Sequence, residues 1–265
     1  EAIRATTQAK EGGATAALLV DCYYNGPSSL ELRTEYYERV LEKVPDIPIV
    51  PYVIPGRSGC ALSAADLAVL HLNDPKRVPA VKQATGDLDR MRLDRQLAGS
   101  ALSILSGDDE LTLTMMRDEK IRASGVISVM SNVAPGAMSA MVRAQVADDA
   151  EEVERLSGAL APMVRTVTCT VTAVRTLPNG QSVEVTDKFR NPVPVKTMMA
   201  GLGMISSTKR APLGRMSPTA VAQCREALRE VHAADPGILG PIEEAFDVRI
   251  DQRLGDDAIW SAFAR

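Results

Sequence analysis

Several features that mark particular classes of protein are scarce or absent in this sequence. Aromatic residues make up only 3% of its 265 positions. The longest apolar runs fall well short of the roughly 18 residues that a membrane-spanning helix needs, and the first residues lack the basic and then apolar pattern of a secretory signal. We therefore expect a cytoplasmic protein with no membrane partner.

Cysteine and histidine are too few and too scattered to form a familiar metal site or disulfide framework. The four cysteines are separated by 38, 109 and 55 residues, which fits neither a zinc motif nor a small secreted scaffold. His71 and His232 lie far apart along the chain, without partners at ligand spacing. We expect reduced thiols, no metal and no cofactor.

Charge of one sign is not concentrated anywhere along the chain. The formal net charge is −4, and the lysines and arginines are scattered, so there is no basic surface for a phosphate backbone and nucleic acid is not expected as a partner. Residues of the hydrophobic class make up 45% of the chain. At this length they can form a large core without disulfides or structural metal.

A repeated order of elements fills the first half of the chain. A short, nearly continuous apolar strand is followed by a loop marked by polar residues, Gly or Pro, and then by an amphipathic helix. The expected strands are 16–20, 47–52, 78–82, 101–105 and 125–129. The last or functional residues of these strands are spaced by 29, 30, 24 and 21 positions, and they are Tyr23, Tyr52, Lys82, Ser106 and Ile127.

Continuous apolar strands in such units predict a parallel sheet covered on both faces by helices. Two architectures fit this pattern. A doubly wound sheet would use the five units as they stand, whereas a (β/α)8 barrel, with roughly 31 residues for each unit, would need three more strands. Periodicity alone leaves both open.

After residue 129 the pattern changes to helices, interrupted once. The expected helices are 136–146, 150–166, 195–202, 218–233 and 241–246. Between them, 166–186 contains β-branched residues on either side of Pro178-Asn179-Gly180. Because Asn-Gly readily takes the positive φ angles of a tight turn, this stretch predicts a β-hairpin with 168–177 paired against 181–188.

Lys82 is the first candidate for chemistry. It ends an apolar strand, at the edge of a parallel sheet where barrel enzymes build their active sites. We expect Lys82 to lie among apolar side chains without an acidic neighbour, since Gln83 follows it. The pKa of such a lysine falls from about 10.4 toward neutrality, and its free amine can attack a carbonyl to form a Schiff base. The alternative is a lysine that simply extends into solvent.

Tyrosines and an arginine surround the same predicted edge. Tyr23 and Tyr24 follow the first strand, and Tyr52 ends the second, just before the Gly-flanked Arg57. Phenols can relay protons during carbinolamine chemistry, and a guanidinium can bind a carboxylate with two parallel hydrogen bonds. For any single tyrosine, the alternative is packing in the core.

Together these segments resemble dihydrodipicolinate synthase, in the family of pyruvate-dependent Schiff-base aldolases that includes N-acetylneuraminate lyase. The resemblance covers residues 1 to about 204, with the motifs in family order. The segments that carry it are Tyr23-Tyr24-Asn25-Gly26-Pro27-Ser28, Tyr52-Val53-Ile54-Pro55-Gly56-Arg57-Ser58-Gly59, Val81-Lys82-Gln83-Ala84-Thr85-Gly86, Ser106-Gly107-Asp108-Asp109, Gly125-Val126-Ile127-Ser128-Val129 and Asn191-Pro192-Val193-Pro194-Val195-Lys196.

The resemblance implies a role for each site residue. Lys82 would form the Schiff base with pyruvate, and Tyr52 would donate and accept the proton. Tyr24 would relay protons into the site of a neighbouring subunit, Ile127 would meet pyruvate through its backbone, and Arg57 would bind the carboxylate of the second substrate.

Two acidic residues follow the fourth expected strand. Asp108 and Asp109 are expected to shape the mouth of the site and to cap the next helix, with no catalytic step assigned to them.

The sequence also departs from the family. Val53, Gln83 and Cys22 stand where the family usually has Asn, Glu and Pro, all beside the expected site. The first three βα units of the family, with their Gly-Thr-Thr-Gly loop, have no counterpart in the sequence. The resemblance therefore implies a (β/α)8 barrel that lacks its first three units, and we expect the chain on its own to show no condensation activity.

The expected domains follow from this count. Residues 1–147 would form barrel units four to eight, and 148–265 a C-terminal helical region with the hairpin insertion 166–188.

The leading hypothesis is a lyase that condenses pyruvate with L-aspartate 4-semialdehyde to give 4-hydroxy-tetrahydrodipicolinate, at the entry to diaminopimelate and lysine biosynthesis. Its partners would be these two small molecules and further copies of the chain, in a homotetramer built as a dimer of dimers. The alternatives are another class I pyruvate aldolase with a different aldehyde, or a non-catalytic barrel relative used in assembly or regulation.

Overall fold

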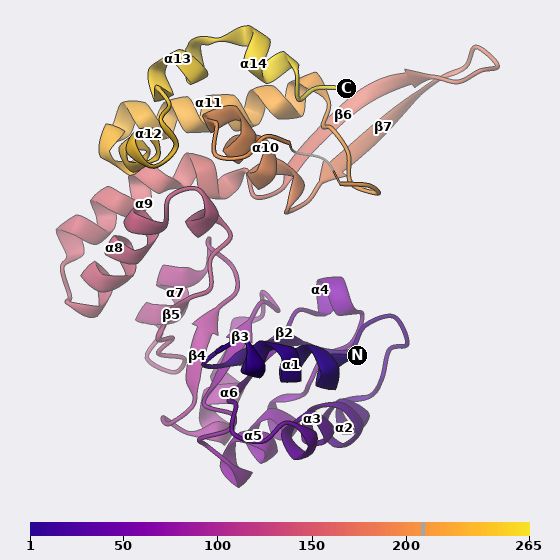
Figure 1. Cartoon of the computed structure of the whole chain (residues 1–265), viewed down its shortest axis with the longest axis vertical. Helices are drawn as coiled ribbons and strands as arrows, with labels where there is room; N and C mark the ends of the chain where they lie inside the picture. The colour runs from indigo at the N-terminus through magenta and orange to yellow at the C-terminus, as the bar shows by residue number, and fades with distance from the viewer. Residues whose placement is uncertain (208–209) are drawn as a thin grey trace. The chain divides into compact units, whose positions relative to one another are not determined.

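Five short parallel strands alternate with helices in the first half of the chain (Figure 1). The computed structural model describes residues 1–207 and 210–265. The chain divides into two units, Glu1–Ile127 and Ser128–Arg265, and each is described by itself. The division expected after residue 147, which rests on a count of barrel units, stays a prediction.

The first unit holds the whole parallel sheet. Its strands are β1 (Ala17–Val20), β2 (Ile49–Val53), β3 (Ala80–Gln83), β4 (Ser103–Ser106) and β5 (Gly125–Val126). Its helices are α1 (Ala2–Glu11), α2 (Ser29–Glu31), the π-helical turn η1 (Leu32–Tyr37), α3 (Glu38–Lys43), α4 (Pro55–Ser58), α5 (Ala64–Asn73), α6 (Leu88–Ala98) and α7 (Thr112–Arg117). All five expected strands are present, each displaced by up to three residues at its ends.

The order of the strands decides between the two architectures. Each strand pairs in parallel with the next one along the chain, in the order β1-β2-β3-β4-β5. A doubly wound sheet reverses its strand order at a switch point, and this sheet does not. Consecutive right-handed crossovers place their helices on one face, which is the winding of a barrel. The α/β parallel class is confirmed, and the doubly wound alternative is wrong.

The two faces of this sheet are buried differently within the unit. Alternate residues of a strand point to opposite faces. Ile49, Val53 and Ile104 face the helices and are fully buried, whereas Leu18 on the other face is 45% exposed. The expectation that helices cover both faces is therefore wrong for this unit, because its crossovers all lie on one side.

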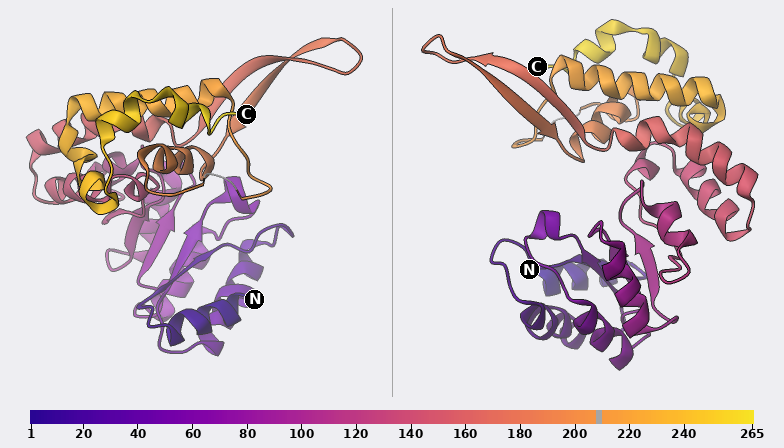
Figure 2. Two further views of the ribbon diagram at one scale, coloured as in Figure 1. Left: turned by 45° about the horizontal axis from the view of Figure 1, so that its top comes forward. Right: turned by 180° about the vertical axis from the view of Figure 1, so that it is seen from behind.

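The second unit is helical and carries a two-stranded ribbon (Figure 2). Its helices are the 3-10 turn η2 (Met130–Asn132), α8 (Pro135–Val146), α9 (Ala150–Arg165), α10 (Val193–Leu202), α11 (Pro218–Ala234), the 3-10 turn η3 (Pro236–Ile238), α12 (Gly240–Phe246), α13 (Ile250–Gly255) and α14 (Asp257–Ser261). The expected C-terminal helical region is confirmed.

The predicted hairpin is also present. Strand β6 (Cys169–Thr176) pairs antiparallel with β7 (Ser182–Phe189). Gly180 has a φ of +86°, and the Leu177 N–H donates to the Gln181 carbonyl at 2.7 Å to close the turn. The hairpin therefore turns at Pro178-Asn179-Gly180, as the turn chemistry predicted.

Within the described residues, no helix combines the length and the apolar character needed to cross a membrane.

One glycine of the second unit allows two helices to approach closely. A Cβ on Gly201 of α10 would lie 2.2 Å from the Trp260 ring, whereas a Cβ on Gly158 of α9 would meet nothing within 4 Å. We predict that Gly201→Ala lowers the free energy of unfolding by about 1 to 3 kcal/mol through overpacking. The matched Gly158→Ala should raise it by about 0.5 to 1 kcal/mol, since alanine favours the helix.

Urea unfolding of both variants measures this difference. Equal effects of the two substitutions would contradict the packing of α10 against Trp260.

Candidate active site

Register partners place one row of side chains across the carboxyl ends of the parallel strands. The row consists of Val20, Tyr52, Lys82, Leu105 and Gly125. Because directly paired residues of neighbouring strands share a face, Lys82 and Tyr52 must lie side by side. This row is the centre of the candidate site.

The contact between Lys82 and Tyr52 is close. The Lys82 Nζ lies 4.1 Å from the centroid of the Tyr52 ring, and the lysine is only 8% exposed. An ammonium over an aromatic face is attracted by the ring quadrupole, which holds the end of this long side chain in place. The sequence prediction that these two residues converge is correct.

Gly107 shapes the wall beside Lys82, and sequence reasoning assigned it no separate role. Its N–H donates to the Gln83 carbonyl at 2.6 Å. A Cβ here would lie 2.7 Å from the Ala84 Cβ and 3.1 Å from the Lys82 Cε. Only glycine lets the chain after β4 approach the lysine side chain so closely. The sequence signal for this close approach was the glycine directly after Ser106.

Burial and charge act in opposite directions on Lys82. Burial lowers the pKa of Lys82, and the negative charges of Asp109 and Asp108 raise it. The expectation that Lys82 has no acidic neighbour is therefore wrong, because the two carboxyls come from the loop after the adjacent strand and not from the neighbouring sequence position. Burial is the larger effect, so the net change favours the neutral amine.

The two aspartates do not start the next helix. Leu111 occupies the position before the first residue of α7, so the expectation that Asp108 or Asp109 caps this helix at that position is wrong. Burial, Asp109 and Glu110 raise the pKa of Asp108, while Lys82 lowers it. The pair therefore acts on the lysine as a nearby source of negative charge.

Tyr52 is influenced by charges from two loops. Burial raises the pKa of its phenol, Asp108 raises it further, and Arg57 lowers it. Arg57 lies on α4, directly after β2, and is exposed. The guanidinium is thus close enough to act on the phenol while remaining accessible to an anion.

Tyr24 and Ile127 are the other two predicted site residues. Tyr24 is 94% exposed after β1, with a φ of +80°, so its ring lies in solvent and does not join the row. The Ile127 N–H donates to the Ser106 carbonyl at 2.9 Å. That bond fixes the backbone of Ile127 next to the end of β4.

Two of the departures from the family pattern lie on the opposite face of the sheet. Val53 follows Tyr52 and Gln83 follows Lys82, so both point to the helix side. Val53 is fully buried in the core. Gln83 donates through Nε2 to the buried Asp94 of α6. The expectation that these two residues border the site is therefore wrong.

The Gln83 amide belongs to a buried polar network behind the site. Arg90 donates through Nε to Asp94 at 2.8 Å and through Nη2 to the Leu62 carbonyl at 2.6 Å. Burial raises the pKa of Asp94, and Arg90 and Gln83 lower it. These bonds tie the end of β3, and so the backbone of Lys82, to α6.

The third departure, Cys22, lies in the loop after β1. Its backbone carbonyl accepts a hydrogen bond from the Cys60 Sγ at 2.7 Å.

Across the described ranges, no three His, Cys, Asp or Glu side chains gather closely enough to hold a metal ion. His71 is buried, with Nδ1 2.8 Å from the Val78 carbonyl oxygen, and the His232 Nε2 lies 2.9 Å from an Asp251 oxygen. Both histidines have structural partners.

Fold and site together define a class of protein. A buried lysine at the carboxyl end of a parallel strand, with a phenol beside it, is the arrangement of an α/β enzyme that uses an amine nucleophile. Residues 1–231 match the Dihydrodipicolinate synthetase family. The chain belongs to this family, whose members are Schiff-base lyases.

Similar proteins and structures agree with this assignment. The chain is 36% identical over 232 residues to the 4-hydroxy-tetrahydrodipicolinate synthase of Methanothrix thermoacetophila. The aligned region covers 87% of this chain and 70% of that protein. The crystal structure of dihydrodipicolinate synthase from Aquifex aeolicus aligns with a TM-score of 0.73 at 33% identity, over 87% of this chain and 70% of that one.

A further structure, of the 4-hydroxy-tetrahydrodipicolinate synthase from Methylacidiphilum fumariolicum, aligns with a TM-score of 0.75 at 29% identity, over 92% of this chain and 72% of that one. The family expected from the motifs, its barrel fold and its enzyme class are confirmed.

The charges around Lys82 lead to a testable prediction. Because the carboxylate of Asp108 raises the pKa of Lys82, Asp108→Asn should lower that pKa and make the amine reactive at lower pH. Acetylation of Lys82, mapped by mass spectrometry across a neutral to alkaline pH series, measures the midpoint. Glu110→Gln is the matched control, since Glu110 acts on Asp108, and it should shift the midpoint less. A midpoint that is unchanged or raised in Asp108→Asn would contradict this electrostatic account.

Proposed function

We propose that this chain carries the nucleophile of a class I lyase, in which Lys82 forms a Schiff base with pyruvate and the second substrate is L-aspartate 4-semialdehyde. The product would be 4-hydroxy-tetrahydrodipicolinate, the entry to diaminopimelate and lysine biosynthesis. The observation that carries the proposal is the buried Lys82 amine held 4.1 Å from the Tyr52 ring. The names of the similar proteins support the choice of substrates.

The first half of the reaction depends on the amine. The lone pair of neutral Lys82 attacks the keto carbon of pyruvate, and the resulting carbinolamine loses water to give the imine. Loss of a proton from the methyl carbon then gives an enamine, which is the carbon nucleophile. Burial supports these steps, because it lowers the pKa of Lys82 and so raises the neutral fraction.

Proton transfer falls to the phenols. Tyr52 would donate a proton to the leaving hydroxyl of the carbinolamine and accept it back. A phenol is already protonated at neutral pH, as a proton donor requires, and the raised pKa of Tyr52 leaves it so. Tyr24, exposed after β1, would complete the relay in the site of a neighbouring copy.

Two further residues would bind the substrates. Arg57 is exposed beside Tyr52 and offers a forked cation to the carboxylate of aspartate semialdehyde. Because the Ile127 N–H is engaged with Ser106, the carbonyl of Ile127 is the group that would contact pyruvate. Arg57 is the reason for preferring a carboxylate-bearing aldehyde over other aldehyde partners.

The nucleophile can be tested without the second substrate. We predict that incubation with pyruvate followed by borohydride reduction gives one covalent adduct on Lys82, located by peptide mass spectrometry. Lys82→Arg should abolish the adduct, while Lys76→Arg, at an exposed position of the same unit, should keep it. An adduct on a different lysine, or none in the unaltered chain, would refute the assignment.

The proton shuttle has its own readout. We predict that Tyr52→Phe slows exchange of the pyruvate methyl protons with deuterated water by roughly 10²- to 10⁴-fold, the range for loss of a positioned acid–base group. Proton NMR measures this exchange, and borohydride trapping on Lys82 should persist in part. Tyr23→Phe is the control, because Tyr23 is 67% exposed and has no assigned role. Unchanged exchange in Tyr52→Phe would remove this residue from the mechanism.

A further inference from the structure

The β6–β7 hairpin is a two-stranded ribbon with little support from its own unit. The start of β6 is anchored, where the Cys169 Sγ lies 3.7 Å from the Cys224 Sγ of α11. Further along, Val174 is 67% exposed and Val183 is 39% exposed. A two-stranded ribbon alone is marginally stable in water, so apolar side chains and free strand edges on it favour a partner.

The hydrogen-bond pattern tells which backbone groups of β7 point outward. Leu177 and Gln181 form a directly bonded pair, because the Leu177 N–H donates to the Gln181 carbonyl. Bonded pairs alternate along an antiparallel ladder, so pairs such as Thr172–Thr186 carry no backbone bond between them. Their hydroxyls lie 2.8 Å apart, as expected for the closer type of pair. The N–H and C=O groups of Ser182, Glu184, Thr186 and Lys188 therefore face away from β6.

We propose that this outward-facing edge of β7, which pairs with no other strand among the described residues, pairs antiparallel with β7 of a second copy of the chain, about a two-fold axis at Thr186. The two hairpins would then form one four-stranded antiparallel sheet. In this register each outward-facing residue of one copy meets an outward-facing residue of the other, so both rows of backbone groups are satisfied.

Charge selects this register. With Thr186 opposite Thr186, Glu184 lies opposite Lys188 of the second copy, and the two-fold axis repeats the pair. A register centred on Glu184 would place Glu184 against itself, and one centred on Asp187 would place Asp187 against itself. Opposite charges directly across a ladder stabilise it and like charges destabilise it, so the register centred on Thr186 is preferred.

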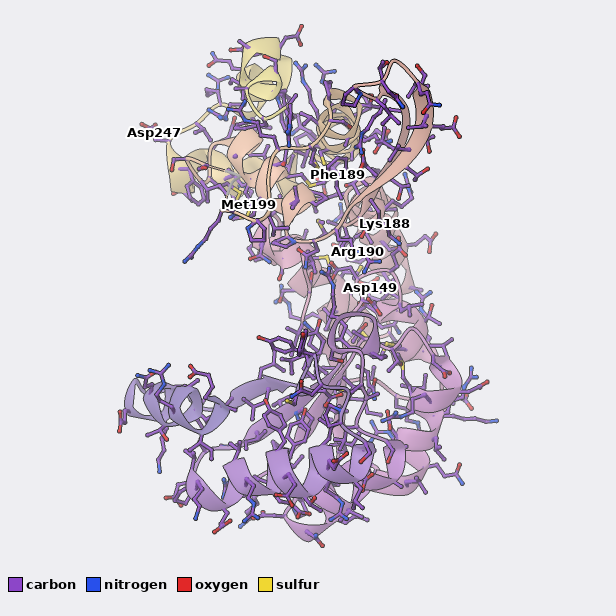
Figure 3. The ribbon with its side chains drawn as sticks, turned by 90° about the vertical axis from the view of Figure 1, so that its right-hand side faces the viewer. Asp149, Lys188, Phe189, Arg190, Met199 and Asp247 are labelled. Carbon is purple, nitrogen blue, oxygen red and sulfur yellow. The ribbon has the colours of Figure 1, made fainter. Side chains whose placement is uncertain are left out.

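Apolar side chains favour the same register. Val183 would lie opposite Phe189 of the second copy, in a pair of the closer type. Figure 3 labels Lys188 and Phe189, which end β7. The outer edge of β6 offers no pair of opposite charges to a second copy. Arg175 is the only charged residue of β6, and it already pairs with Asp187. The edge of β7 is therefore the one that fits a second copy.

Cysteine cross-linking tests the contact directly. In the proposed sheet the two Thr186 positions are one strand spacing apart, about 5 Å, whereas the two Thr172 positions are three spacings apart, about 14 Å. We expect a short bis-maleimide to link two copies of the full chain through Thr186→Cys. The same reagent should leave the matched Thr172→Cys at the level of the unaltered chain, which carries the background from its own cysteines. Thermal unfolding followed by circular dichroism checks that both variants fold.

Charge reversal in the Thr186→Cys chain tests the register. Glu184→Lys and Lys188→Glu, made separately, should each weaken association by roughly tenfold, because two attractive pairs become repulsive. An equimolar mixture of the two variants should restore linking, and so should the double variant.

Three results would overturn the proposal. The first is an equal yield of cross-linked dimer at positions 172 and 186, and the second is no cross-linked dimer at position 186. The third is a yield at position 186 that the charge reversals leave unchanged. None of these outcomes depends on the chemistry at Lys82.

Discussion

The parallel register that sets Tyr52 opposite Lys82 is the constraint on which the rest of the candidate site depends. It places an amine and a phenol on one face of the sheet, and the alternation of side chains sends Val53 and Gln83 to the other face. On that helix-covered side, Gln83, Asp94 and Arg90 tie the end of β3 to α6. The candidate site residues and the polar network that holds β3 in place therefore lie on opposite faces of the same sheet.

Desolvation and charge together set the state of the amine. Burial favours neutral Lys82, while Asp108 and Asp109 favour the ammonium. Burial and the same Asp108 raise the pKa of Tyr52, so its phenol stays protonated at neutral pH, as any phenol does. A nucleophile needs a lone pair and a proton donor needs a proton, so the two shifts suit the two proposed roles. Gly107 allows this arrangement, since any larger residue would meet the stem of Lys82.

Much of this could be predicted from the sequence. The continuous apolar runs identified all five strands, Pro178-Asn179-Gly180 identified the hairpin turn, and the strand-end position of Lys82 made it the candidate nucleophile. Pattern could not choose between a barrel-type and a doubly wound sheet, because strand order is a long-range property. Neither could it show that Asp108 acts on Lys82, since that contact crosses from one strand end to the next. The orientation of Val53 and Gln83 was available from the period of two along each strand.

The central claim is that this strand-end row makes Lys82 the nucleophile toward pyruvate. The most direct measurement is NMR of the chain with 15N at the lysine side chains after addition of pyruvate labelled with 13C at its keto carbon. We expect one imine signal with a one-bond carbon–nitrogen coupling, assigned to the Lys82 Nζ. A spectrum that holds only free keto acid and its hydrate, or an imine on another lysine, would contradict it.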